Sequence, residues 1–469
     1  MTAGVPTARQ RLLFAAAAIV LLALAPPALA APLALLGTTL IDGTGAAPVP
    51  NATVIIDGDR IVAAGPGGLV SIPPDAERLD VTGKWLLPGL IDAHMHFFQS
   101  GGAYARPDIL DLRTVRPYAD EVAAVKAATP ATLARYLASG ITSVVDVGGP
   151  LWTFDARAAA NATPIAPRVA VSGPLLATCA PAEVTVADPP MIQVATAEQG
   201  RAEVRRLLPY RPDLIKIWFV YAGLEIRPQL DWVRAVIAEA HAAGVRVAVH
   251  ATELRVARAV VEAGADVLVH GIDDEIADAP MLFQLRTLGV IYTPTFAVVE
   301  GYNRALGLAF RPTAMETRTG DPAAIRSILS LANLPAAQRP RALRPAPVPP
   351  IDPESAANLR RLRDAGGIIA AGSDAGNIGT LHGPGLHREM ELMVEAGLTP
   401  MEVLVAATKN GAAVMGRADL GTVAAGKLAD LLLLDADPLA DIRNTTRIYR
   451  VLRGGVMHDP AAILATIDR

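Results

Sequence analysis

The sequence predicts an α/β protein: a (β/α)8 TIM barrel with a small discontinuous β-sandwich domain that both chain ends build. Two observations lead to this prediction. Between about residues 85 and 415, short β-branched runs alternate with longer amphipathic helical segments, which is the pattern of parallel βα units. On either side of that region, short strand-like runs are separated by turn residues. A chain of 469 residues suffices for one large and one smaller domain.

The barrel prediction rests on eight runs that have the composition of buried strands. Helical stretches such as LDWVRAVIAEAHAAG and RVARAVVEAGA lie between them, each with a glycine suited to a helix C-terminus. Eight such units make a barrel of ordinary size. The runs are WLLPGLIDAHMHF, ITSVVDVGG, RVAVSGPLL, LIKIWF, RVAVHAT, VLVHG, VIYTPTF and IIAAGSDAG.

The sequence divides into four expected segments. Turn signals at Asp57-Gly58 and Gly454-Gly455 mark hairpins near the two ends of the chain, which supports a domain assembled from both. The expected boundaries are 1–30 for a signal peptide, 31–88 and 415–469 for the two sandwich parts, and 89–414 for the barrel.

The first thirty residues have the composition of a secretory signal peptide. Arg9 and Arg11 precede the apolar run LLFAAAAIVLLALA, and Ala28-Leu29-Ala30 offers a small-residue cleavage site. Pro26-Pro27 and the short run argue against a membrane anchor. We therefore expect an exported protein, periplasmic or secreted, that has no membrane association after cleavage near Ala31.

Composition also narrows the class of partner. The formal net charge of −4, without a basic stripe, gives no electrostatic footprint for nucleic acid. The single cysteine, Cys179, excludes an internal disulfide. A small-molecule substrate is expected, and a homo-oligomer stays open.

Metal-binding residue types stand at the ends of five strand runs. His94 and His96 are two positions apart in a strand, so both imidazoles project to the same face. Barrel active sites form at the carboxyl ends of the strands, so these residues are expected to converge. Each one alone could be structural, and Asp374 could cap a helix. The remaining members are Lys216, His250, His270 and Asp374.

These features together resemble the amidohydrolase superfamily of metal-dependent hydrolases, in particular its imidazolonepropionase-related and prolidase-like branch. The resemblance rests on PGLIDAHMH, the strand endings and the tail LGTVAAGKLADLLLLDADPLADIRN, and it covers essentially the mature chain. It implies two divalent metal ions, one held by His94, His96 and Asp374 and the other by His250 and His270. Neutral imidazoles and oxygen donors favour zinc.

The resemblance also implies that Lys216 is carboxylated to N6-carboxylysine and bridges the two ions together with a hydroxide. A buried ammonium without a partner is costly, and reaction with carbon dioxide converts it into an anionic carbamate. The implied reaction is hydrolysis of an amide or peptide-like C–N bond, in an N-acyl amino acid, a dipeptide or a cyclic amide. Asp374 would act as general base and then as general acid.

Two alternatives remain. The segment HATE places Glu253 three residues beyond His250, as in mononuclear aminohydrolases that release ammonia from a ring; Glu253 could equally cap the next helix. Lys216 argues against a deaminase, which has no use for a carbamate ligand. The other alternative is a catalytically inactive barrel that only binds a ligand. It predicts missing metal ligands, whereas all six are present.

Substrate-binding residues are less visible in the sequence. Tyr221, on the loop after the Lys216 strand, and His382, in LHGPGLHREM, are candidates. The segment after the third strand, VSGPLLATCAPAEVTVADPP, lacks the histidine of the prolidase-like branch, so substrate recognition is expected to differ. The long segment 311–350 ends in RPRALRPAPVPP, and we expect it to form a loop that acts as a lid.

Overall fold

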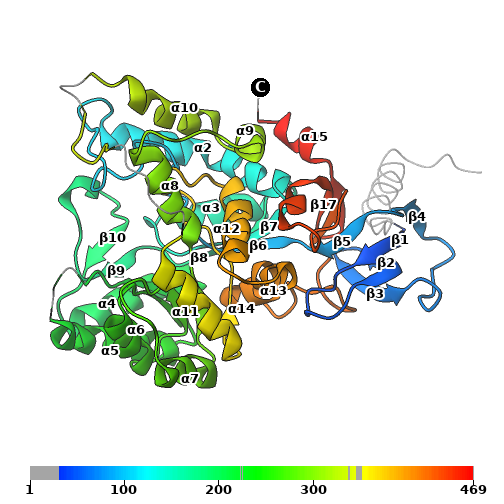
Figure 1. The fold of residues 1–469 in the computed structure, drawn as a ribbon, viewed down its shortest axis with the longest axis horizontal. Helices are drawn as coiled ribbons and strands as arrows, with labels where there is room; N and C mark the ends of the chain where they lie inside the picture. The colour runs from blue at the N-terminus through cyan, green and yellow to red at the C-terminus, as the bar shows by residue number, and fades with distance from the viewer. Residues whose placement is uncertain (1–30, 222, 224, 336–338, 345–350, 468–469) are drawn as a thin grey trace, which may run out of the picture.

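A computed structural model describes residues 31–221, 223, 225–335, 339–344 and 351–467 (Figure 1). The expected signal peptide lies outside the described residues. Among the described helices, none combines the length and apolarity needed to cross a bilayer.

One eight-stranded sheet is built from both ends of the chain. Its N-terminal and C-terminal strands are joined where β5 pairs antiparallel with β16, so the blue and red ends of the ribbon lie side by side (Figure 1). The predicted turns at residues 58 and 454–455 separate β2 from β3 and β17 from β18. The strands are β1 (Leu33–Leu40), β2 (Val49–Asp57), β3 (Arg60–Pro66), β4 (Glu77–Asp80), β5 (Trp85–Pro88), β16 (Leu431–Leu434), β17 (Ile448–Arg453) and β18 (Val456–His458).

The sequence predicts a β-sandwich for this part, and hydrogen bonds connect its strands in one continuous path. The physical reason is that β5 pairs with β1 on one side and β16 on the other, which makes the two sets of strands neighbours in a single hydrogen-bonded path. A separate apolar cluster, which includes Leu35, Val54, Leu431 and Leu452, forms the core of this sheet.

The middle of the chain forms two parallel sheets, in the orders β6-β7-β8 and β10-β9-β11-β12-β13-β14-β15. Every one of the eight predicted strand runs contains an observed strand. The strands are β6 (Leu90–Met95), β7 (Ile141–Asp146), β8 (Arg168–Val171), β9 (Leu175–Ala177), β10 (Met191–Gln193), β11 (Leu214–Trp218), β12 (Arg246–His250), β13 (Val267–Val269), β14 (Ile291–Thr293) and β15 (Ile368–Ile369).

Backbone hydrogen bonds connect the edges of the two parallel sheets. Asp213 N donates to Val171 O at 2.9 Å, next to β8, and Ala93 N of β6 donates to Ala371 O at 3.0 Å, beyond β15. An apolar cluster that includes Ile91, Val145 and Val269 takes residues from several strands of both sheets. The arrangement is that of a TIM-barrel-type α/β fold.

The helices cover the outside of the parallel strands (Figure 1). They are amphipathic, and α6 for example buries Val256, Val260 and Val261. The two predicted helices correspond to α5 and α6, and left-handed glycines follow both. The helices are α2 (Tyr118–Ala138), α3 (Thr153–Asn161), α4 (Ala197–Leu207), α5 (Ile226–Ala242), α6 (Leu254–Glu262), α7 (Ala279–Leu288), α8 (Phe296–Leu306), α9 (Ala314–Thr319), α10 (Pro322–Ser330), α11 (Pro353–Asp364), α12 (Pro384–Glu395), α13 (Pro400–Val405), α14 (Gly411–Met415) and α15 (Pro460–Leu464).

The segment 311–350 is not the plain loop that the sequence predicts, because it contains α9 and α10. Local capping explains both helices. Thr313 and Glu316 form a reciprocal capping box at the start of α9, and the Asp321 carboxylate accepts a hydrogen bond from Ala323 N at the start of α10. Residues 336–338 and 345–350 lie outside the described part, so the lid stays a prediction.

The packing of α12 against α8 buries an acidic side chain. Glu389 of α12 is 0% exposed, and its Oε2 accepts a hydrogen bond of 2.7 Å from Ala297 N in the first turn of α8. Burial raises the pKa of Glu389 to about 8, against the stabilising effect of the backbone N–H groups.

We expect a pH-dependent stability from this residue. The folded pKa lies above the unfolded value of 4.5, so the contribution of Glu389 is fully present below pH 4.5 and is lost as the pH rises to about 8. A difference of one bound proton between the folded and unfolded states changes the unfolding free energy by about 1.4 kcal/mol per pH unit. Urea denaturation at pH 5.5 and 7.5 should show a smaller loss in Glu389→Gln than in the wild type. The exposed Glu262→Gln should behave as the wild type.

Candidate metal centre

Six side chains of types that can bind a metal lie at or near the carboxyl ends of the parallel strands. Side chains at these ends meet at the same edge, because the strands run in one direction. His94 belongs to β6 and His96 follows it, Lys216 lies in β11 and His250 ends β12. The two remaining residues, His270 and Asp374, follow β13 and β15.

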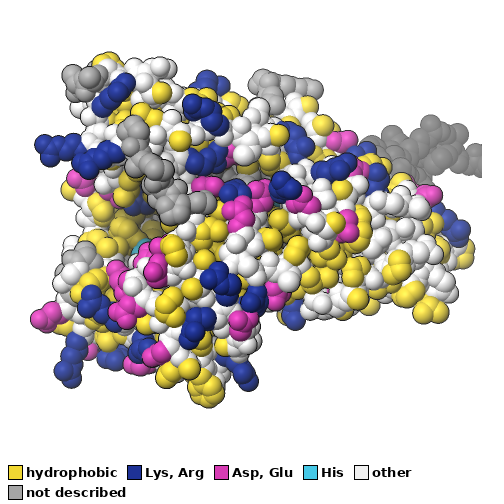
Figure 2. Space-filling model, in the orientation of Figure 1, with side chains coloured by type: hydrophobic (Ala, Val, Ile, Leu, Met, Phe, Trp, Pro, Cys, Tyr) yellow, Lys and Arg dark blue, Asp and Glu magenta, His cyan; other side chains and the backbone are white. Residues whose placement is uncertain are grey.

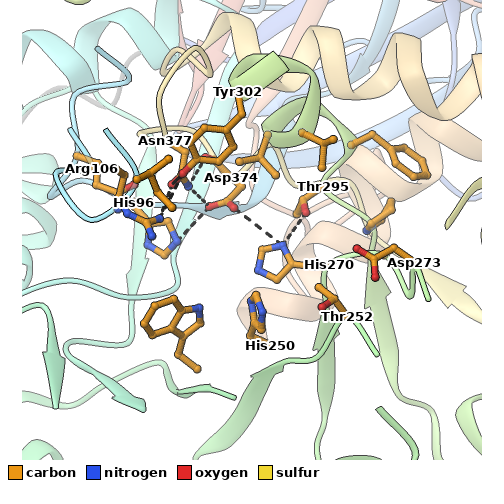
Figure 3. A pocket seen from close by; sticks show the side chains of 18 of the residues that line it. His96, Arg106, His250, Thr252, His270, Asp273, Thr295, Tyr302, Asp374 and Asn377 are labelled. Atoms are coloured by element: carbon orange, nitrogen blue, oxygen red, sulfur yellow. Dashed lines mark hydrogen bonds and ion pairs between the residues drawn. The ribbon is translucent and has the colours of Figure 1, made fainter. Parts of the chain in front are cut away.

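Asp374 lies among the imidazoles. Its Oδ1 is 3.4 Å from His94 Nε2 and 3.1 Å from His96 Nε2, and its Oδ2 is 3.9 Å from His270 Nδ1 (Figure 3). The ring centroids of His250 and His270 are 4.4 Å apart. The structure therefore brings the five strand-end residues around one point, as the sequence predicts.

Lys216 belongs to the same group, because it lines the same cavity. It is 1% exposed, and its Nζ has no hydrogen-bond partner. Burial lowers the pKa of its amine to about 7, and the charge of Asp374 partly opposes this shift. A buried amine of this kind is largely uncharged above neutral pH, which leaves its lone pair available.

Three of the imidazoles, those of His94, His250 and His270, are neutral at physiological pH. Burial lowers the pKa of His250 to about 3 and the pKa values of His94 and His270 well below their usual range, with Lys216 adding to each shift. Neutral imidazole is the form that binds metals.

Two of the histidines are oriented by partners outside the group. His96 Nδ1 lies 2.8 Å from Gly148 O, so it donates there, and this hydrogen bond holds the ring with Nε2 on the side of Asp374. His270 Nδ1 lies 2.8 Å from Thr295 Oγ1. His270, Thr295 and Asp374 all have positive φ values of 77°, 53° and 54°. Such left-handed backbone is unusual for non-glycine residues and clusters at functional sites.

A cavity of about 390 Å³ opens onto the group, and it is lined by His96, Lys216, His250, His270 and Asp374. His94 is 0% exposed and lies behind this lining. Figure 2 shows the hollow, with a histidine visible in it. The cavity is large enough for a small organic substrate.

The other sequence candidates lie outside this lining. Tyr221 packs under Arg255, with 3.9 Å between the guanidinium carbon and the ring centroid. Glu253 occupies the N-cap position of α6 without a side-chain capping hydrogen bond. His382 lines a neighbouring cavity of about 210 Å³, and its Nε2 lies 2.9 Å from His96 O, so it supports the main chain of a candidate ligand. The structure does not bring these three into the main cavity.

Three residues of the cavity wall were not found from the sequence. Arg106 and Tyr302 both contact Oδ1 of Asn377, and Asn377 in turn contacts Asp374 (Figure 3). Asn377 follows Asp374 by three positions in SDAGN, which is a local signal that could have identified it. Arg106 lies in a loop and Tyr302 lies in α8, and no local sequence pattern points to either residue.

One rim of the cavity is acidic. Asp273 and Asp352 line it, and acidic side chains are visible beside the hollow in Figure 2. Burial first, and then the charges of Asp352, Glu253 and Asp274, raise the pKa of Asp273 to about 6. In the adjacent helix α6, Arg258 forms an ion pair with Asp278 and therefore does not pair with this acidic rim.

A carboxylate rim favours substrates that carry a positive charge. We expect Asp273→Asn to lower kcat/KM by about threefold to tenfold for a substrate with an ammonium group and to leave a neutral analogue unchanged. Salt should reduce the difference. Glu262→Gln, at the far end of α6, removes a charge away from the cavity and serves as the control. Equal losses on both substrates would contradict this expectation.

The donor set fits a metal site. Both ring nitrogens of His94, Nδ1 of His250 and Nζ of Lys216 are buried without hydrogen-bond partners. Ligand atoms of His94, His270 and Asp374 all lie within 4.8 Å of one another. Buried nitrogen atoms without a hydrogen-bond partner are energetically unfavourable unless a metal ion binds them.

Comparisons with known proteins identify the family of this chain. The sequence pattern of the amidohydrolase family matches residues 85–457. The chain is 26% identical to an imidazolonepropionase of Streptomyces coelicolor over 83% of this chain and 86% of that protein. One similar structure is a protein described as a candidate prolidase from Bifidobacterium longum, with 25% sequence identity and a TM-score of 0.67 over 94% of this chain and 100% of that one. Another is a Xaa-Pro dipeptidase with bound methionine, with 23% sequence identity and a TM-score of 0.69 over 91% of this chain and 100% of that one.

The fold and the site define a class, the metal-dependent hydrolases. The chain belongs to the amidohydrolase family, and it is a hydrolase that acts on C–N bonds.

Proposed function

We propose that this protein is an exported binuclear amidohydrolase. Its substrate is an N-acyl amino acid, a dipeptide or a cyclic amide, of which it hydrolyses the amide or peptide-like C–N bond. The prolidase and dipeptidase names of two similar structures favour a dipeptide. The proposal includes a closed (β/α)8 barrel and the domain boundaries expected from the sequence.

The observation that carries this proposal is Lys216. Its amine is buried, has no hydrogen-bond partner and lies among His94, His250, His270 and Asp374. An isolated ammonium is unfavourable there. Attack of the uncharged amine on carbon dioxide forms one N–C bond, releases one proton and yields a carbamate anion, which offers two oxygens.

The residues would divide between two ions. One ion would be held by His94, His96 and Asp374. The other ion would be held by His250 and His270, and the carbamate of Lys216 would bind both ions. When bound, zinc or another divalent metal supplies Lewis acidity that polarises the scissile carbonyl and lowers the pKa of water. The hard oxygen and imidazole donors, without a thiolate, suit such ions.

Asp374 would carry out the proton transfers. Its carboxylate lines the cavity and is 5% exposed, so a water and a substrate can reach it. It accepts the proton of the attacking water and then delivers it to the leaving amine, which cannot depart as an anion.

Metal analysis together with a substrate panel tests the proposal. We expect about two ions per mature chain, and hydrolysis within a panel of dipeptides, N-acyl amino acids and cyclic amides. One ion per chain, with ammonia released from a ring amine, would favour the mononuclear aminohydrolase with Glu253 as proton shuttle. Two bound ions with no turnover of any compound would point to the inactive binding protein.

Export is tested separately. Fractionation of cells that produce the full chain, with N-terminal sequencing, should find a mature protein that begins near Ala31 outside the cytoplasm. An intact N-terminus in the cytoplasm would refute this part and leave the proposed chemistry untouched.

A further inference from the structure

The carboxylate of Asp374 is held by one buried amide. Asn377 is 3% exposed, and its Nδ2 donates to Asp374 Oδ1 at 2.8 Å and to Asp374 O at 3.1 Å. The amide thus restrains both the side chain and the left-handed main chain of the same residue, whose φ is 54°. An unfavourable backbone conformation persists only when its surroundings restrain it.

Two donors fix which way this amide faces. Tyr302 donates from its hydroxyl to Asn377 Oδ1 at 2.7 Å, and Arg106 donates from Nη1 to the same oxygen at 2.8 Å (Figure 3). A flipped amide would place its N–H groups against the guanidinium and its oxygen against the Asp374 carboxylate. Both contacts would be repulsive, so only the observed orientation is compatible with the surroundings.

Arg106 is itself anchored. Its Nε and Nη2 donate to the two carboxylate oxygens of Asp108 at 2.8 and 2.6 Å, a bidentate pair that leaves Nη1 directed at Asn377. The arginine is therefore occupied by protein groups, and its role is to hold the amide.

The two oxygens of Asp374 consequently differ. Oδ1 accepts from Asn377 and faces the Nε2 atoms of His94 and His96 at 3.4 and 3.1 Å. Oδ2 lies 3.9 Å from His270 Nδ1, beyond hydrogen-bond distance. Oδ2 is the oxygen that remains able to exchange a proton.

We infer that Asn377, locked by Tyr302 and Arg106, is a positioning residue that commits Oδ1 of Asp374 to the metal-binding side and leaves Oδ2 to carry the proton. This rests on the proposed function for the proton transfer, whereas the restraint of the ligand does not depend on the substrate.

The test compares Asn377→Leu, which keeps the approximate shape and removes both donors, with Tyr302→Phe, which removes one of the two contacts that orient the amide. In Asn377→Leu we expect kcat to fall by about 10- to 100-fold with KM nearly unchanged, and zinc affinity in a chelator-buffered titration to fall by about tenfold. Tyr302→Phe should show smaller changes of the same kind.

A matched control and a double-mutant cycle separate positioning from general damage. Asn358 is also 3% exposed and hydrogen-bonds to three backbone groups, so Asn358→Leu should lower the melting temperature without the loss of zinc affinity. In the Asp374→Asn background, Asn377→Leu should have no further effect on kcat. Additive losses there, or wild-type zinc affinity in Asn377→Leu, would overturn the inference. If the wild type hydrolyses no amide, the proposed function fails, and the zinc titration still decides the positioning role.

Discussion

Replacing Lys216 by alanine is expected to abolish amide hydrolysis, by roughly a thousandfold or more, and to lower the metal content from about two ions to one or fewer. The reason is that, in the proposed centre, the other ligands divide between two ions, and only the carbamate would join the two sets. Lys216 is 1% exposed, so no surface effect of the substitution is expected. Metal analysis and single-substrate kinetics measure both consequences.

The matched variant is Lys216→Met, which fills the space that alanine leaves. A short carboxylic acid such as acetate can enter the vacated volume in Lys216→Ala and supply two oxygens in place of the carbamate. We expect added acetate to restore part of the activity and the second ion in Lys216→Ala and neither in Lys216→Met. Full activity with two ions in Lys216→Ala would refute the binuclear proposal.

The substitution Asp374→Asn is expected to lower kcat by about 10²- to 10⁴-fold, the usual range for a general acid–base group. The amide has the size of the carboxylate but cannot take up a proton. Because the proposed role includes proton delivery to the leaving amine, the loss should be smaller for an ester whose alcohol leaves as a stable anion. Steady-state kinetics on a matched amide and ester pair measure this difference.

Asn358→Leu controls for stability in this experiment as well. Equal losses on the amide and the ester would show that Asp374 serves only as a ligand. A variant that keeps wild-type kcat on the amide would exclude Asp374 from the chemistry.

The strand-end residues could be predicted because they depend on local pattern and on one topological rule. Residues two apart in a strand share a face, which paired His94 with His96, and parallel strands present their carboxyl ends at one edge. The rule then brings Lys216, His250 and Asp374 to the same place without knowledge of any contact. The structure places them accordingly.

Predictions that depended on the conformation of loops agree less well with the structure. Tyr221 and Glu253 follow strands closely, but the main chain carries both outside the cavity lining. The segment 311–350 contains α9 and α10, because capping residues there start helices that a proline-rich composition concealed.

The sequence by itself determined the alternation of strands and helices, and with it the set of imidazoles, amine and carboxylate that face one another, because side-chain periodicity is a local property of the backbone. Only the tertiary structure decided how Asp374 is held. That restraint needs Arg106, Tyr302 and Asn377 to meet from a loop, a helix and a strand end, and hydrogen bonds between such distant residues leave no periodic trace in the chain.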